Sequence, residues 1–352
     1  MKTNWQKITS GTDTRMWLDS AALEEMRYAL DNGAVGVTCN PVIALRTLKL
    51  ELSYWEPIIR KMIADNPTAT EDEIGWMVVR LISTERSKLL LPAFEKWKGK
   101  YGRLSIQTDP RLFRDKERIV RQAVEFSSMA PNIIVKIPVL TEGLKAIEEA
   151  TYQGVSINAT VSFAITQVVQ VAEAVMRGFA RREKEGKDCS HMGPVCTIML
   201  GRTDDYCKEE IEKLHLDVDP ELTKWCGIAI YKKAFRIYTE KKYPLRLLAA
   251  AFRTNLHVSE LVGGEYVLSP AFKVVKEFND DSSYVFDPDA INKPVDPAIV
   301  GQLQKIPTFR QAYDDDGMTV DEFAKFGPAR VAMDQFCASC NDLATLIRTY
   351  MI

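Results

Sequence analysis

The stretch Ile133-Ile134-Val135-Lys136-Ile137-Pro138 decides the fold. Four of its six residues are β-branched, and its apolar residues follow one another without alternating with polar ones. A continuous apolar run of this length is typical of a parallel strand that is covered on both faces. The run therefore predicts a parallel sheet with helices packed against it.

Seven other short runs have a similar character and are separated by long amphipathic segments. The eight predicted strands are Arg15–Leu18, Val35–Thr38, Leu104–Gln107, Ile133–Ile137, Ser156–Ala159, Val195–Leu200, Leu245–Ala251 and Tyr266–Leu268. Helical patterns between them include Ile119–Ser128, Glu142–Tyr152, Phe163–Glu185 and Thr223–Lys241. Eight strands, each followed by helical sequence, predict a single (β/α)8 TIM barrel spanning residues 1–352. An open doubly wound sheet has the same local alternation and is the alternative.

Two segments interrupt this alternation. Residues 48–100 contain no clear strand, and the patterns at Trp55–Ala64 and Glu71–Leu91 predict a helical insertion after the second strand. Residues 279–308 are rich in Asp, Pro and Ser and are expected to form an extended loop. Helices at Val320–Lys325 and Ala329–Tyr350 are predicted to follow, so that 279–352 packs on the barrel.

Composition excludes several functions. The chain has 352 residues, with 46 Lys and Arg against 48 Asp and Glu, so it has no basic excess with which to bind nucleic acid. We expect no membrane partner, because there is no run of 18 apolar residues. Seven scattered cysteines and a polar start indicate a reduced, cytoplasmic protein. The oligomeric state is open, with a homodimer as one candidate.

Cofactor motifs are absent from the sequence. Neither G-x-G-x-x-G nor G-x-x-x-x-G-K-[ST] occurs, and the three histidines lie far apart. Cys337-Ala-Ser-Cys340 is the sole C-x-x-C pair, and we interpret it as a half-buried pair on a helix. We therefore expect chemistry by side chains alone, with neither a metal nor an organic cofactor.

Polar residues recur where the predicted strands end. In a (β/α)8 barrel the carboxyl ends of the strands meet at one face, where reactive groups lie. The set comprises Asp19, Thr38, Asn40, Gln107, Lys136, Asn158, Thr160, Thr197, Arg202 and Arg253.

Lys136 is the most informative of these residues, because lysine is almost never fully buried. In so apolar a strand, burial would disfavour the ammonium ion and leave a neutral amine able to attack a carbonyl. The alternative is a lysine at a strand edge that extends to water. Pro138 argues against this, since a strand that ends there places Lys136 at the reactive rim.

The remaining residues allow structural interpretations too. Asp19 is equally a candidate N-cap for a helix that begins near Ala21, and Asn40 before Pro41 a candidate turn residue. Asn158 lies inside a strand, where Asn is disfavoured, so its amide is expected to bond within the barrel mouth. Arg202 and Arg253 beside a buried lysine indicate a site for an anionic group such as phosphate.

In this order, these residues resemble the transaldolase family. The likeness lies in Trp17-Leu18-Asp19, Gly36-Val37-Thr38-Cys39-Asn40-Pro41, Val135-Lys136-Ile137-Pro138, Ile157-Asn158-Ala159-Thr160, Gly201-Arg202 and Ala251-Phe252-Arg253. It covers most of the chain and is closest to the larger bacterial members.

The resemblance implies a cofactor-free Schiff-base enzyme on a (β/α)8 barrel, acting on sugar phosphates. Lys136 would attack the C2 carbonyl of a ketose phosphate, and Asp19 would exchange the C4 hydroxyl proton. Roles implied for the other residues are hydroxyl binding (Thr38, Asn40, Asn158, Thr197), phosphate binding (Arg202, Arg253) and water positioning (Thr160, Gln107).

Three positions depart from the family pattern: Gln107 replaces a glutamate, Ala251 a frequent serine, and Met199 a common aromatic residue. Glutamine orients a water but does not exchange a proton with it. (Glu85 superficially matches the missing motif but lies in helical sequence.) Fructose-6-phosphate aldolases also carry glutamine there and release free dihydroxyacetone. The resemblance predicts transaldolase activity in carbohydrate metabolism and the pentose phosphate pathway. The alternatives are simple aldol cleavage, action on a modified anionic ketose, and non-catalytic binding of a sugar phosphate.

Overall fold

The computed structural model describes residues 2–352, and its centre is a closed barrel of eight parallel strands. The strands follow one another around the barrel in chain order, and β8 pairs with β1 to close it. This closure confirms the (β/α)8 prediction and excludes the open sheet. The strands are β1 (Arg15–Leu18), β2 (Ala34–Cys39), β3 (Arg103–Gln107), β4 (Ile133–Pro138), β5 (Ile157–Ser162), β6 (Val195–Met199), β7 (Arg246–Ala250) and β8 (Val267–Ser269).

Apolar side chains fill the inside of the barrel. Within the barrel, a ligand therefore has room only at the mouth. Trp17, Ile134, Val195, Leu248 and Val267 come from five different strands and form one buried cluster. Since side chains alternate between the two faces of a strand, residues two positions further along point the same way and lie nearer the carboxyl end. The packed interior thus gives way to a polar layer at the mouth.

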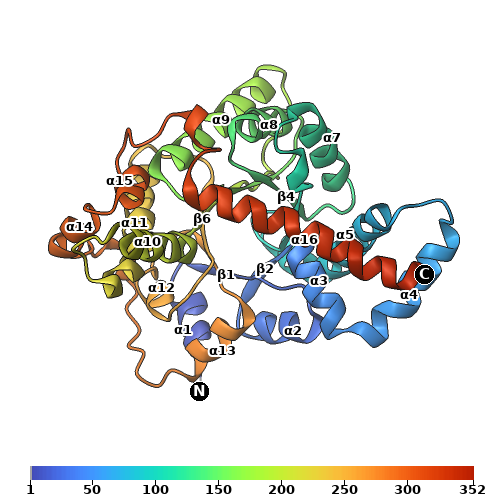
Figure 1. Ribbon diagram of the computed structural model, residues 1–352, viewed down its shortest axis with the longest axis horizontal. Helices are drawn as coiled ribbons and strands as arrows, with labels where there is room; N and C mark the ends of the chain where they lie inside the picture. Colours follow the sequence, from blue (N-terminus) through green and yellow to red (C-terminus); the bar gives the residue numbers. More distant parts are fainter. Residues whose placement is uncertain (1) are drawn as a thin grey trace.

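Helices surround the barrel, as the alternating pattern predicts (Figure 1). After α1 (Asn4–Gly11), the helices next to the strands are α2 (Leu23–Asp31), α3 (Pro41–Leu50), α7 (Lys116–Ser127), α8 (Thr141–Tyr152), α9 (Ile165–Lys184), α10 (Leu200–Leu214), α11 (Cys226–Glu240), α12 (Leu256–Ser259) and α13 (Phe272–Asp280). Gly154 follows α8 with a φ of 92°, a left-handed conformation that suits glycine and ends the helix.

The insertion between β2 and β3 is helical, as predicted. It contains α4 (Leu52–Asp65), α5 (Glu71–Ser87), a 3₁₀ turn (Lys88–Leu90) and α6 (Leu91–Lys96). The buried Arg86 in α5 joins this insertion to the barrel, because it donates to Glu51 and to the carbonyl oxygen of Ala21. None of the helices within residues 2–352 is both long and apolar enough to cross a membrane.

The segment after α13 differs from the sequence-based prediction. Residues 279–308 are not an extended loop throughout, because they contain a 3₁₀ turn (Ala290–Asn292) and α14 (Pro297–Leu303). Asp296 caps α14 by accepting a hydrogen bond from the Ala298 N–H, and proline suits the first turn of a helix. The helix predicted at Val320–Lys325 is instead a 3₁₀ turn over Val320–Glu322, which follows α15 (Pro307–Tyr313).

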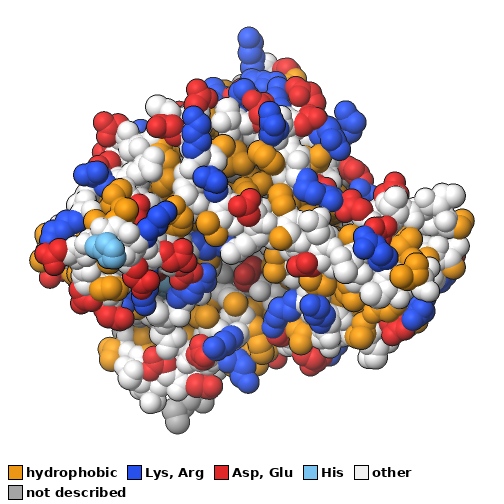
Figure 2. All heavy atoms as spheres, viewed as in Figure 1, with side chains coloured by type: hydrophobic (Ala, Val, Ile, Leu, Met, Phe, Trp, Pro, Cys, Tyr) orange, Lys and Arg blue, Asp and Glu red, His pale blue; other side chains and the backbone are white. Residues whose placement is uncertain are grey.

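The chain ends in the long helix α16 (Gly327–Met351), which contains both cysteines of the C-x-x-C pair. Figure 1 shows α16 crossing in front of the barrel, and it contacts α3, α5 and β5. Its first half therefore lies at the carboxyl ends of the strands. The same face is hollowed just below α16, with acidic and basic side chains around the hollow (Figure 2).

Candidate active site

Lys136 lies at the centre of the barrel mouth and has 5% of its surface exposed. It shares the inward face of β4 with Ile134, which belongs to the packed interior. Burial lowers the pKa of the Lys136 amine, and the nearby Arg202 guanidinium lowers it further. The Asp19 carboxylate acts in the opposite direction but does not outweigh burial. The amine is therefore more nucleophilic near neutral pH than that of an ordinary lysine.

Gln107 and Asn158 flank Lys136 at the same level of the barrel, since the pairing of β3 with β4 and of β4 with β5 aligns all three residues. The Asn158 amide is fixed: its Nδ2 donates to Ser105 Oγ at 3.0 Å, and its Oδ1 accepts from Thr197 Oγ1 at 2.7 Å. Gln107 differs, because within residues 2–352 neither its Oε1 nor its Nε2 has a partner, although both are buried. A buried amide without partners is costly unless a water or ligand bonds to it.

Asp19 faces the same mouth from the end of β1. Its Oδ1 accepts a hydrogen bond from Thr38 Oγ1 on β2 at 2.6 Å, and its side chain remains partly exposed. The helix-cap interpretation of Asp19 is wrong, because α2 begins only after Ala22. Asp19 thus presents a carboxylate, held by Thr38, toward the space next to Lys136.

Asn40 directly follows β2, Thr160 lies in β5, and both are buried. Asn40 is the N-cap of α3, since its Oδ1 accepts from the Ile43 N–H at 2.9 Å. Its Nδ2 is left to reach a ligand, so the structural and functional interpretations of Asn40 are compatible. Thr160 pairs in register with Pro138 of β4, and its Oγ1 lies 4.0 Å from the sulfur of Met199.

The two arginines lie side by side at the edge of the mouth. Arg202 is near the start of α10, and Arg253 follows β7. Burial lowers the pKa of Arg202, and repulsion from Arg253 adds to this effect. In this structure Arg202 Nη1 donates to Gln335, and Arg253 donates to Asp205 through Nε and Nη2. A cavity of about 140 Å³ is lined by these four side chains, among others.

The backbone around the arginines holds them close together despite their repulsion. The Gly201 N–H donates to the carbonyl oxygen of Ala251, and a Cβ on Gly201 would lie only 2.4 Å from that oxygen. Ala251 itself has a φ of 61°. The N–H of Arg253 donates to His257 Nδ1, and His257 Nε2 lies 2.8 Å from Asp204 on α10. This arrangement prepares a site for an anion, since two adjacent guanidinium groups attract one.

Of the ten residues singled out in the sequence, Asp19, Asn40 and Arg253 follow strands and Arg202 lies in the first turn of α10. The other six lie within strands, and Asn158 is the second residue of β5. The structure also adds residues that the sequence did not indicate. Ser105 holds Asn158, and it could have been found because it precedes Gln107 by two residues on the same face of β3. Phe336 and Gln335 of α16 reach Lys136 and Arg202, and nothing in their local sequence indicates this.

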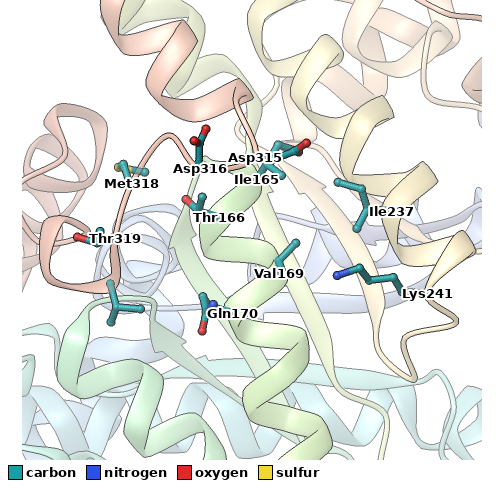
Figure 3. Close-up of a pocket in the computed structure, with 11 residues that line it drawn as sticks. Ile165, Thr166, Val169, Gln170, Ile237, Lys241, Asp315, Asp316, Met318 and Thr319 are labelled. Carbon is teal, nitrogen blue, oxygen red and sulfur yellow. The ribbon is translucent and has the colours of Figure 1, made fainter.

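A larger cavity, of about 550 Å³, lies elsewhere. It is formed by α9, α11 and the segment that ends at Val320, and Figure 3 shows Ile165, Val169 and Ile237 lining it beside Lys241. None of the residues predicted to be functional lines this cavity. It is therefore separate from the site at the barrel mouth.

The fold and the site together define a class: (β/α)8 barrels with a desolvated lysine, a carboxylate and an adjacent pair of arginines at the mouth of the barrel. The transaldolase/fructose-6-phosphate aldolase family matches residues 16–345, and the chain belongs to this family.

Individual relatives are distant in sequence but similar along much of their length. The chain is 27% identical over 353 residues to the transaldolase of Thiobacillus denitrificans, an alignment that covers 96% of this chain and 95% of that protein. It is 28% identical over 243 residues to the transaldolases of Thermobifida fusca and Mycolicibacterium smegmatis. Those alignments cover 66% of this chain and 64% of each relative.

Proposed function

We propose that this chain is a transaldolase-type enzyme that transfers a dihydroxyacetone unit from a ketose phosphate to an aldose phosphate. The observation that carries the proposal is the burial of Lys136 at the barrel mouth, within the electrostatic influence of Asp19 and Arg202. Membership of the transaldolase/fructose-6-phosphate aldolase family supports the same chemistry.

In the first half-reaction, the neutral amine of Lys136 attacks C2 of the ketose, and loss of water gives a protonated imine. Asp19 accepts the proton of the C4 hydroxyl, and the electrons of the C3–C4 bond move toward the imine nitrogen. An aldose phosphate leaves, and a three-carbon enamine remains on the lysine. The enamine then attacks the aldehyde of the acceptor, Asp19 returns the proton, and hydrolysis of the new imine frees Lys136.

The polar layer around Lys136 suits the remaining tasks. Asn158, held rigid by Ser105 and Thr197, presents an amide to the hydroxyl groups of the bound unit. Asn40 contributes its Nδ2, and Thr38 keeps Asp19 in place. Water that enters and leaves during imine chemistry is positioned by Thr160 and by the amide of Gln107, whose two polar atoms have no protein partner within residues 2–352.

Arg202 and Arg253 bind the phosphate group of the sugar. Their present partners are weaker than a phosphate dianion would be, because Gln335 is uncharged and Asp205 is exposed to solvent. A bound phosphate would therefore replace these contacts. Ala251 in place of a serine removes one hydroxyl from this region, which favours a ketose with a different anionic group as an alternative substrate.

Simple aldol cleavage is the second candidate, and Gln107 favours it. An amide orients a water molecule without accepting its proton, so deprotonation of the catalytic water is slower and transfer to an acceptor is less well supported. A non-catalytic sugar-phosphate binder is the candidate from another class. We also propose a cytoplasmic location, which the seven free cysteines of the described residues support, and a homodimer remains a prediction.

The experiment is a turnover assay with a ketose phosphate in the presence and absence of an aldose phosphate acceptor. Transfer predicts product only with the acceptor, whereas cleavage predicts free dihydroxyacetone without it. The Lys136→Ala variant is expected to lose both activities, and Gln107→Glu is expected to shift the balance toward transfer. An active Lys136→Ala variant contradicts the proposal, and an inactive wild type that still binds the ketose phosphate supports the binder.

A further inference from the structure

The aromatic ring of Phe336 covers the proposed nucleophile. Its centroid lies 5.9 Å from Lys136 Nζ and 5.6 Å from Arg202 Cζ, so the ring contacts both halves of the site. Phe336 is 3% exposed and belongs to α16, which crosses the barrel mouth in Figure 1. The ring therefore covers the side of the amine that faces α16.

We propose that Phe336 is a positioning residue that excludes water from the Lys136 amine and so keeps it neutral and reactive. The inference rests on the proposed Schiff-base function and adds a residue from a distant part of the chain to that mechanism. The ring must also lie beside the sugar, because a ketose phosphate that joins Lys136 to Arg202 has to pass Phe336.

Two effects of the ring on the amine oppose each other. An aromatic face attracts an ammonium ion and would favour its charged form, but this attraction weakens at about 6 Å, close to the distance found here. Removal of water favours the neutral amine, and burial is the largest influence on the pKa of Lys136. The Phe336 variants show which effect of the ring is larger, because a raised midpoint means that exclusion of water outweighs the attraction.

The charged groups that shift the pKa of Lys136 come from elements other than α16. The charged groups that act on Lys136 are Asp19 from the end of β1 and Arg202 from α10, while its neighbours across the sheet, Gln107 and Asn158, are uncharged. The titratable groups of α16 closest in sequence to Phe336 are Asp334, Cys337 and Cys340. Burial raises the pKa of both thiols, and the nearby Asp109 raises it further.

The ring is held in place from both sides along the helix. Gln335, the preceding residue, accepts a hydrogen bond from Arg202, and this bond ties α16 to α10. Further along, Leu343 packs against Gly75 of α5, and Arg348 forms an ion pair with Glu71. Phe336 is thus part of a fixed cover over the lysine.

The test measures how the reactivity of Lys136 depends on pH. The full chain is incubated with dihydroxyacetone and cyanoborohydride, and the labelling rate of Lys136 is followed by peptide mass spectrometry. Dihydroxyacetone carries no phosphate, so the arginines do not influence the result through substrate binding. The midpoint of the rise in labelling rate with pH reports deprotonation of the amine, and the highest rate reached reports access. The pH dependence of the reductant itself is common to all variants.

Phe336→Ala is expected to raise the midpoint and to slow labelling severalfold at neutral pH. Phe336→Leu keeps an apolar cover, so its midpoint is expected to rise by a smaller amount, and it decides the test if the alanine variant does not fold. Leu343→Ala is the matched control, because it removes a buried side chain from the same helix away from Lys136 and should leave the midpoint unchanged.

Three results would overturn the inference: an unchanged midpoint in the Phe336 variants, a lowered one, or an equal rise in Leu343→Ala. The last would mean that loosening of α16, and not loss of the ring, admits water. Failure of the wild type to label at Lys136 would instead reject the proposed function itself. The two failures are therefore distinguishable.

Discussion

Replacing Lys136 by methionine should stabilise the fold while it abolishes activity. Methionine has nearly the same length and no charge, so it fills the position without the cost of keeping an ammonium group out of water. Asp19 loses a cation but keeps its hydrogen bond from Thr38 and its contact with solvent. We expect a gain of about 1–2 kcal/mol, which lies within the range of single stabilising substitutions.

The change in melting temperature follows from the size of the chain. With an unfolding entropy of about 2.1 cal/mol/K per residue, 352 residues give about 0.7 kcal/mol per kelvin. The Lys136→Met variant should then melt about 1–3 °C higher than the wild type near neutral pH. Scanning calorimetry or thermal unfolding followed by circular dichroism measures this difference.

The stability gained by Lys136→Met should decrease as the pH rises. The folded state lowers the pKa of Lys136, so between the folded and unfolded pKa values the unfolded chain binds more protons. Wild-type stability therefore rises with pH in this window, and the advantage of the methionine variant shrinks. Lys145→Met is the control: Lys145 is exposed and pairs with Glu142, so the change should stay within about 0.5 kcal/mol. A Lys136→Met variant that is less stable than the wild type at neutral pH would refute the reasoning.

Two further substitutions test the supports of the site. Thr197→Val removes the hydroxyl that donates to Asn158 Oδ1, and it should cost about 1–3 kcal/mol in urea unfolding and lower kcat; an unchanged stability would mean that this bond has no role. His257→Leu leaves Asp204 Oδ2 buried without its partner, although Oδ1 still accepts from the Gly227 N–H, and this should cost about 1–3 kcal/mol. The change also frees the Arg253 backbone, so KM for a ketose phosphate should rise. Burial already raises the pKa of Asp204, so this destabilisation should be larger at neutral pH than at acidic pH, where the carboxyl is protonated; urea unfolding at both pH values checks the sign.

Much of the fold could be predicted because each strand carries its own local signal. The apolar run at Ile133–Pro138 indicates a strand covered on both sides, and the runs that follow repeat this pattern. Closure of the barrel is different, because it depends on the pairing of Arg15 and Met16 with Val267 and Leu268 near the other end of the chain. An open sheet has the same local pattern, so the sequence alone left that alternative.

The residues of the site divide in the same way, into those that a local sequence signal indicates and those that depend on distant parts of the chain. Residues at strand ends, such as Asp19 and Gln107, could be found because strand order and direction place them at one face. The contribution of α16 could not, since the path of a C-terminal helix over the mouth depends on its packing against α3 and α5. Polar composition at 279–308 hid α14, whose start is determined by Asp296 and Pro297.

The most direct test of the account is to identify the residue that carries the sugar. The protein is incubated with a ketose phosphate, reduced with borohydride, digested and mapped by mass spectrometry, with Lys136→Ala treated in parallel. The account predicts one stable adduct, on the peptide that contains Lys136, and no adduct in the variant. An adduct at a different lysine, or an unmodified protein under turnover conditions, would contradict it.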